Sequence, residues 1–183
     1  VRRAEAQIRS AGAVVAQLEV PMATVQCVAE IAYDAGVPFL LNPAPAQWLN
    51  PSLLKVVSVL TPNESEARIL TGIDVVDAAS ARKAAEMLLG AGVKAVIVTL
   101  GDKGFLLAEG NATELVPAMK VKAVDTTAAG DAFAGSLAVG LAQGRNLREA
   151  ALFANRVAAF SVTRLGAQTS MPTRKELEEF TAG

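Results

Sequence analysis

Short apolar runs alternate with longer amphipathic stretches along most of the chain. The apolar runs predict β-strands at residues 13–20, 37–42, 56–60, 95–99, 105–108, 113–116 and 121–124. Helical periodicity and capping residues predict helices at residues 21–36, 64–70, 78–89, 129–143 and 147–164, and a last helix capped by Thr173. Residues 109–111 are typical of a hairpin turn. Strands that alternate with helices indicate right-handed βαβ units, and therefore an α/β fold with a mostly parallel sheet.

The composition agrees with a sheet that is buried on both faces. Hydrophobic residues make up 52% of the 183 residues, aromatic residues only 4%, and the mean hydropathy is +0.36. Val, Leu, Ile and Ala must therefore fill the core, as they do in parallel sheets. The length indicates one domain with a substantial core.

Charge and hydropathy argue against nucleic acid or a membrane as a partner. The net charge is −1, the isoelectric point is about 5.6, and no long basic run occurs. The uncharged stretch 37–54 contains four prolines, so it cannot form a membrane-spanning helix. No signal-peptide pattern is visible. The single Cys27, set in an apolar helical pattern, suits a buried thiol in a reducing compartment, and we expect a cytoplasmic protein.

The chain contains no histidine. A Ser-His-Asp or Cys-His mechanism is therefore excluded, and so is a zinc or iron site with histidine ligands. A general base must be Asp, Glu, Lys or Tyr. The chain also lacks a Walker A sequence and a G-x-G-x-x-G sequence, so neither a P-loop kinase nor a standard dinucleotide-binding fold is supported.

The most informative segment is residues 124–131, Val-Asp-Thr-Thr-Ala-Ala-Gly-Asp, where an apolar strand is expected to give way to an apolar helix. Such a turn leaves backbone N–H groups free at a helix N-terminus, and small side chains let an anion approach them. Asp131 falls in the first helical turn, beside any anion bound there. An anion site next to a carboxylate suggests phosphoryl transfer to a hydroxyl with Asp131 as the base. The alternative is that Asp125 or Asp131 only caps a helix.

Polar residues and a glycine also follow the predicted strands at their carboxyl ends, where ligands bind in open α/β sheets. They are Glu19, Asn42, Asn63, Gly101 and Asp125. Asn63 and Glu66 are three residues apart, so they can face one ligand or form a capping box, and the sequence favours neither. Residues 99–104 form a glycine-flanked turn, which alone is a weak signal.

Several segments together resemble the ribokinase-type family of sugar and nucleoside kinases. They are residues 124–131, Asn-Pro-Ala-Pro-Ala at 42–46, Thr-Pro-Asn-Glu-Ser-Glu-Ala at 61–67, Val-Thr-Leu-Gly at 98–101 with Lys103 and Gly104, and residues 162–172. The resemblance runs from about residue 17 to the C-terminus. It implies a three-layer α/β/α fold with a mostly parallel central sheet. It also implies ATP-dependent phosphorylation of the primary hydroxyl of a sugar, with D-ribose expected first and fructose, deoxyribose, 2-keto-3-deoxygluconate or a nucleoside as alternatives.

The resemblance assigns roles in catalysis and substrate binding. Asp131 would take the proton from the sugar hydroxyl, and the N–H groups of Ala128, Ala129 and Gly130 would stabilise the transferring phosphoryl group. The sugar would contact Glu19 and Asp131. ATP would contact Asn63, Thr99, Gly101, Asp102, Lys103, Gly104, Gly130 and Asn155. On its own pattern, Asn155 would be a polar residue on a helix surface.

The resemblance also implies two metal ions. Glu66 would organise Mg²⁺ through water, which suits an ion that keeps its hydration shell. K⁺ would be held, in part through main-chain carbonyls, by Asp125, Thr127, Ser161, Arg164, Gly166 and Ser170. An ordinary loop after a helix is the alternative for residues 162–170.

The early part of ribokinase-type kinases carries a glycine-rich sugar-binding segment and a small β-sheet lid, and neither has a counterpart here. The chain begins at Val1, in a polar helical stretch. We therefore expect residues 1–183 to be a single α/β nucleotide-binding portion. Most sugar contacts, and a homodimer interface formed by the lid, would be absent. A nucleotide-binding fragment without turnover is an alternative to an active kinase.

Overall fold

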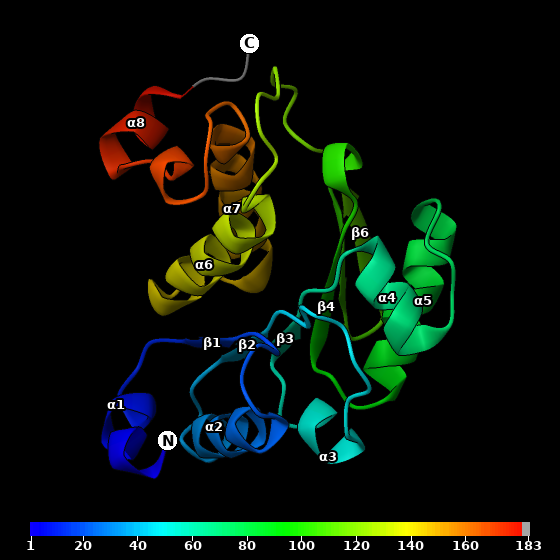
Figure 1. Ribbon diagram of the computed structural model, residues 1–183. Helices are drawn as coiled ribbons and strands as arrows, with labels where there is room; N and C mark the ends of the chain where they lie inside the picture. Colours follow the sequence, from blue (N-terminus) through cyan, green and yellow to red (C-terminus); the bar gives the residue numbers. More distant parts are fainter. Residues whose placement is uncertain (181–183) are drawn as a thin grey trace. The chain divides into compact units, whose positions relative to one another are not determined.

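The computed structural model describes residues 1–180, which divide into two compact units. Of the described residues, unit 1 comprises 1–101 and 105–116, and unit 2 comprises 102–104 and 117–180. Unit 1 contains a β-sheet with its helices, whereas unit 2 is built from helices and the loops that join them (Figure 1).

Six strands form one sheet in unit 1, in the order in which they follow one another along the chain (Figure 1). They are β1 Val14–Ala16, β2 Phe39–Leu41, β3 Val59–Leu60, β4 Ala95–Thr99, β5 Phe105–Glu109 and β6 Ala112–Val116. Strands β1 to β4 run parallel to one another, while β5 is antiparallel to both β4 and β6. Parallel neighbours joined by helices are the βαβ arrangement that the sequence pattern predicts.

The helices of unit 1 are α1 Glu5–Arg9, α2 Met22–Asp34, α3 Pro51–Leu54, α4 Glu64–Thr71 and α5 Ala78–Gly90, with the short 3₁₀ turn η1 Arg2–Ala4. A second 3₁₀ turn, η2 Gly101–Lys103, begins at the last residue of this part of unit 1, and its other residues belong to unit 2. Side-chain caps fix where three of the α-helices begin. The side chains of Asn50, Asn63 and Asp77 accept hydrogen bonds from the first turns of α3, α4 and α5. Gly72, in the left-handed conformation, ends α4.

The main core lies between one face of the sheet and helices α2 to α5. Alternate strand residues such as Phe39, Leu41 and Val98 are completely buried and belong to the same apolar cluster as residues of these helices. The strand residues between them, including Leu40 and Ile97, are buried as well. Apolar residues therefore occupy both faces of the strands, as expected for a parallel sheet.

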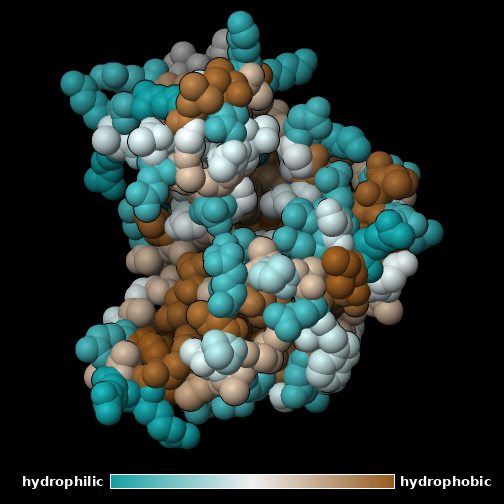
Figure 2. Space-filling view, viewed as in Figure 1, coloured by the Kyte–Doolittle hydropathy of each residue, from teal (hydrophilic) through white to brown (hydrophobic). Residues whose placement is uncertain are grey.

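Strand β1 lies at one edge of the sheet, with a hydrogen-bonded neighbour on one side only. Its central residue, Val15, is 40% exposed, and nearby Val20 is 48% exposed. Figure 2 shows apolar side chains gathered on the surface over β1. An edge strand that carries exposed apolar residues is a surface on which further chain can pair or associate.

Unit 2 contains α6 Ala129–Ala142, α7 Leu147–Ser161, the 3₁₀ turn η3 Gln168–Ser170 and α8 Arg174–Glu179. Helices α6 and α7 pack closely where Gly140 meets Ala150. A Cβ atom added at Gly140 would lie only 2.8 Å from the Cβ of Ala150, so glycine permits this approach. A second apolar cluster joins α6, α7 and α8 through Ala132, Val157, Phe160 and Leu177. No helix among residues 1–180 is long and apolar enough to cross a membrane.

Most of the predicted elements are confirmed, but the prediction of a strand at residues 121–124 is wrong. Residues 117–128 are irregular, and the Val124 and Asp125 N–H groups both donate to the Val162 carbonyl, beyond the end of α7. The alternation of apolar residues with Lys120 and Lys122 resembles a strand, but no strand within residues 1–180 pairs with this segment. Helix α7 also ends at Ser161, earlier than predicted, because the chain turns there into the loop that contacts this segment.

Candidate active site

The turn before α6 has the backbone shape of an anion site. Ala128 lies in the left-handed region at φ 60°, and the α-helix begins at the next residue. A left-handed residue followed by right-handed ones directs successive N–H groups to the same side, where they attract an anion. Among residues 1–180, Ala128 is the one residue other than glycine with a positive φ. Such strain persists only where the surrounding structure holds it, and it often marks a functional site.

The N–H groups of this turn differ in whether they already donate a hydrogen bond within the protein. Ala129 donates to the Thr126 carbonyl at 3.2 Å. Within residues 1–180, the N–H groups of Ala128 and Gly130 have no hydrogen-bond acceptor. No side chain caps α6, so neither Asp125 nor Asp131 is an N-cap. The N-terminus of α6 can therefore offer backbone N–H groups to a ligand.

Asp125 joins this turn to the loop that follows α7. Its Oδ1 accepts from the Thr127 N–H and its Oδ2 from the Gly166 N–H, both at 2.9 Å. The Gly166 bond, followed by those from Thr127, lowers the pKa of Asp125 below its ordinary value. The ionised carboxylate thus fixes both segments in contact.

The loop of residues 162–170 is ordered by its own hydrogen bonds. The Thr169 and Ser170 hydroxyls each donate to a loop carbonyl three or four residues earlier. Ser161, the last residue of α7, donates to the Ala158 carbonyl of its own helix, and Ser161 and Ser170 are completely buried. Gly166 has φ 91°, and a Cβ built there would lie 2.5 Å from the Thr169 hydroxyl oxygen. Only glycine fits this position. Most of the predicted potassium ligands therefore lie in two segments that Asp125 holds together.

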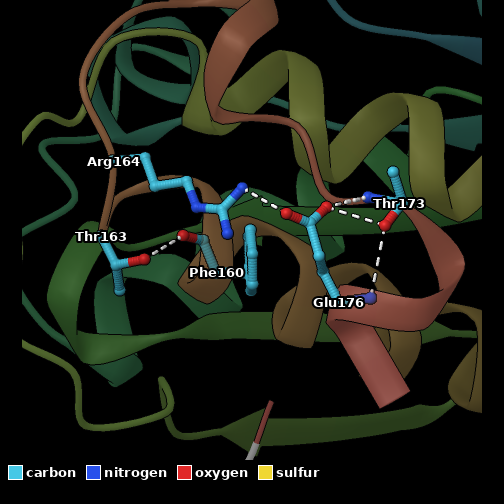
Figure 3. Close-up of polar contacts among 5 residues, drawn as sticks. All are labelled: Phe160, Thr163, Arg164, Thr173 and Glu176. Carbon is cyan, nitrogen blue, oxygen red and sulfur yellow. Dashed lines mark hydrogen bonds and ion pairs between the residues drawn. The ribbon is translucent and has the colours of Figure 1, made fainter. Parts of the chain in front are cut away.

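The side chain of Arg164 points from this loop to α8 (Figure 3). Its guanidinium group is 2.8 Å from Glu176 and lies over the Phe160 ring, 4.3 Å from the ring centre. Hydrogen bonds from the Thr173 N–H and hydroxyl, and then from Arg164, lower the pKa of Glu176 to about 2. Because the side chain of Arg164 contacts Glu176 and Phe160, the predicted role as a potassium ligand can fall only to its main chain.

Asp131 lies exposed in the first turn of α6, three residues after Ala128. It stands at the margin of a groove of about 980 Å³ within unit 2, bounded by α6, α7 and residues 171–178. Gly135 and Phe153 are among the residues that line the groove. Asp131 thus follows the proposed anion site by three residues in the chain, within the first turn of the same helix.

Asn63 and Glu66, in unit 1, form a capping box at the start of α4. The sequence allowed either this capping box or a shared ligand. The Asn63 side chain accepts from the Glu66 N–H and Glu66 accepts from the Asn63 N–H, both at 2.9 Å. Glu66 is partly buried, and this burial raises its pKa, although the Asn63 bond opposes the rise. Thr99 forms a parallel bridge to Asn63, so the ends of β3 and β4 bring these residues together.

The other predicted ligand residues occupy loops and one helix. Gly101 and Gly104 both have positive φ, at 56° and 103°, and flank the exposed Asp102 and Lys103 in η2.

Glu19 is exposed in the bend that follows β1. In unit 2, Asn155 lies on α7 and donates to the Pro117 carbonyl at 3.0 Å, which ties the start of the irregular segment to the helix. Its side-chain amide therefore has a structural partner.

The contacts of Glu176 were not predicted from the sequence, although a signal for some of them was present. Thr173-x-x-Glu176 is the pattern of a capping box, and the structure shows both of its hydrogen bonds. The contact with Arg164 could not be read from the sequence, because it joins residues twelve positions apart through the fold. Within residues 1–180, no group of three or more His, Cys, Asp or Glu side chains could hold a metal ion.

Comparison with known proteins fixes the family. The model of the pfkB family of carbohydrate kinases matches residues 3–174, nearly the whole chain. The chain belongs to the pfkB family of carbohydrate kinases. The resemblance to ribokinase-type kinases seen in the sequence is thereby confirmed.

Ribokinases are prominent among the relatives of this pfkB-family chain. It is 44% identical over 180 residues to the ribokinase of Haemophilus influenzae and 39% identical over 181 residues to a deoxyribokinase of Salmonella typhimurium. Its structure matches that of Arabidopsis thaliana ribokinase complexed with ribose and ATP, with a TM-score of 0.92 and 32% identity over 98% of the chain. The predicted α/β fold with a mostly parallel sheet is confirmed.

The pfkB-family chain is shorter than these relatives. The matches cover 98% of it but 59% of the length of each of the two curated relatives and 58% of the Arabidopsis chain.

Proposed function

We propose that the chain carries the nucleotide-binding and phosphoryl-transfer part of an ATP-dependent sugar kinase. The observation that supports this most strongly is the strained turn at Ala128, with N–H groups at the start of α6 and Asp131 three residues further on. Anion-binding N–H groups next to a carboxylate provide what phosphoryl transfer to an alcohol requires.

In the proposed reaction, Asp131 accepts the proton from the primary hydroxyl of the sugar. The hydroxyl oxygen attacks the γ-phosphorus of ATP, the bond from that phosphorus to the β-phosphate oxygen breaks, and ADP leaves. The N–H groups of the turn stabilise the negative charge on the transferring group. No histidine competes for the role of base. For ATP itself, we propose the contacts predicted from the sequence, in particular Asn63, Thr99 and residues 101–104.

The proposed substrate is D-ribose, which would yield ribose 5-phosphate. The 44% identity to a ribokinase and the TM-score of 0.92 to a ribokinase with bound ribose support ribose. The 39% identity to a deoxyribokinase makes deoxyribose the leading alternative. Glu19 and Asp131 are the residues of this chain that we propose contact the sugar.

Two metal ions are proposed on the chemistry of the residues present. Asp125, the hydroxyl groups and the main-chain carbonyls of residues 161–170 are oxygen ligands of the kind that suit K⁺. The ion would hold the turn at residues 125–127 in place beside the nucleotide. Glu66, partly buried and next to Asn63, suits an indirect contact with Mg²⁺ through water.

The test uses a chimera, in which this chain replaces the matching 180 residues of the Haemophilus influenzae ribokinase. The chimera is assayed for ADP release with D-ribose, deoxyribose, fructose, 2-keto-3-deoxygluconate and a nucleoside. We expect the highest kcat/KM with D-ribose. A folded chimera that binds MgATP in calorimetry but phosphorylates none of these compounds would contradict the proposal.

A nucleotide-binding fragment without turnover is a second candidate for the chain by itself. The observation that favours it is that the chain spans only 59% of the length of the ribokinase and deoxyribokinase relatives. Calorimetry with MgATP and a kinase assay on the same preparation of the chain separate the two functions.

A further inference from the structure

Glu176 lies at the centre of a set of contacts that join α8 to the loop after α7 (Figure 3). One of its carboxylate oxygens accepts from the Thr173 N–H and hydroxyl, both at 2.8 Å. The other oxygen accepts from the Arg164 guanidinium, also at 2.8 Å. Because Arg164 additionally lies over the Phe160 ring, its side chain is restrained from two directions.

This restraint leads by short steps to the turn before α6. Two residues after Arg164, the Gly166 N–H donates to Asp125 Oδ2, and the other oxygen of Asp125 holds the Thr127 N–H. The backbone between Arg164 and Gly166 has little freedom, because Gly166 packs against Thr169 and the Thr169 hydroxyl donates to the Leu165 carbonyl. A shift of Arg164 would therefore move the donor on which Asp125 depends.

We propose that Glu176 is a positioning residue for the turn at residues 125–131, acting through Arg164, Gly166 and Asp125. Only the identity of the anion bound at this turn rests on the proposed kinase function. These contacts give α8 a role that is separate from binding the nucleotide or the sugar. Through Arg164, α8 holds the loop at residues 162–170 in the position in which the Gly166 N–H donates to Asp125.

Substitutions can separate the contact of Glu176 with Arg164 from its part in capping α8. In Glu176→Gln the side chain keeps an oxygen for the Thr173 N–H, and Gln serves as well as Glu in a capping box. It loses the negative charge that Arg164 contacts. Arg164→Met removes the same contact from the other side, together with the contact between Arg164 and the Phe160 ring, and leaves the capping box intact. Glu179→Gln, an exposed change on the same helix, is the matched control.

The experiment measures amide hydrogen exchange of the whole chain by NMR, at the Gly166 and Thr127 N–H groups. Glu176→Gln and Arg164→Met should each raise exchange at both amides about two- to five-fold, the range that an exposed charge pair supports. The double variant should exchange no faster than Arg164→Met alone, because Arg164→Met already removes the contact with Glu176. Glu179→Gln should behave as the unchanged chain.

Unchanged protection of Gly166 in Glu176→Gln would overturn the proposal, and so would additive effects in the double variant. These readouts need no ligand. Calorimetry with MgATP then tests the consequence: Glu176→Gln should weaken binding by a similar factor, while Glu179→Gln should not. If the unchanged chain binds no MgATP, the proposed function fails while the exchange data still decide whether Glu176 positions the turn.

Discussion

Asp131 is the side chain on which the proposed chemistry depends. In the ribokinase chimera, Asp131→Asn should lower kcat by about 10²–10⁴, the usual range for loss of a general base. The affinity for MgATP should change little, because the N–H groups of the turn remain. Steady-state kinetics and calorimetry check both expectations, with Asp34→Asn, an exposed aspartate at the end of α2 in unit 1, as the control. Near-normal kcat in Asp131→Asn would remove this residue from the role of base.

Gly166 is the position at which a single methyl group should do the most damage to the loop after α7. Gly166→Ala must accept φ 91° and a Cβ 2.5 Å from the Thr169 hydroxyl oxygen, so the free energy of unfolding should fall by about 1–3 kcal/mol. Urea denaturation measures the change. Gly135→Ala is the contrast, because its Cβ meets nothing within 4 Å and Ala favours the helix, so stability should hold or rise. Equal losses in the two variants would show that the backbone of Gly166 is not special.

Helix α5 offers a test of how a charged cap depends on pH. Asp77 Oδ1 accepts from the Ser80 N–H at 2.8 Å and from its hydroxyl at 2.6 Å, and these bonds lower the pKa of Asp77. A lowered pKa means that the stabilisation is present above the ordinary pKa of 3.8 and is lost as the pH falls through the folded-state value. Asp77→Asn keeps a capping oxygen but carries no charge.

The chain should therefore be more stable than Asp77→Asn at about pH 6, and the gap should close towards about pH 3. Urea midpoints across this range measure the gap. A difference that stays constant with pH would mean that the charge of Asp77 contributes nothing.

The pairing of the turn at residues 125–127 with the loop at residues 162–170 gives a prediction about ions. K⁺ should activate the chimera without taking part in bond making, because it would hold the turn beside ATP. Rates in K⁺ and in a bulky organic cation at equal ionic strength should differ, and Asp125→Asn should reduce the difference. Identical rates in the two salts would indicate that Asp125 alone holds the segments.

The chain taken as a whole should not phosphorylate ribose at a useful rate by itself. It spans 59% of the length of the ribokinase relative, and Glu19 and Asp131 are the only residues to which we assign sugar contacts. Two contacts rarely orient a small polyol, and orientation and exclusion of water supply much of a kinase's rate. A coupled ADP-release assay on the purified chain, beside the chimera, makes the comparison. Robust ribose-dependent turnover by the monodisperse chain would refute this prediction.

The α/β fold could be predicted from the sequence because its signals are local. Apolar runs such as residues 95–99 form strands wherever a neighbour is available, and the turn at residues 109–111 needs only its own glycine. The candidate site could be located for the same reason, since residues 124–131 carry the small side chains and the carboxylates in one stretch. The strand predicted at residues 121–124 failed because strand formation needs a partner, and alternation alone does not supply one.

The sequence by itself determined the α/β class, most of the strands and longer helices, the family and the place of Asp131 in the first turn of a helix. Each of these depends on residues that are close together in the chain. Only the tertiary structure decided that Asp125 bonds to Gly166, that Arg164 turns towards Glu176, and that Ala128 adopts a left-handed backbone. The two contacts arise because chain folding brings distant donors and acceptors within hydrogen-bond distance, and no spacing along the sequence encodes such a distance. The backbone of Ala128 keeps its positive φ because the surrounding structure holds it there.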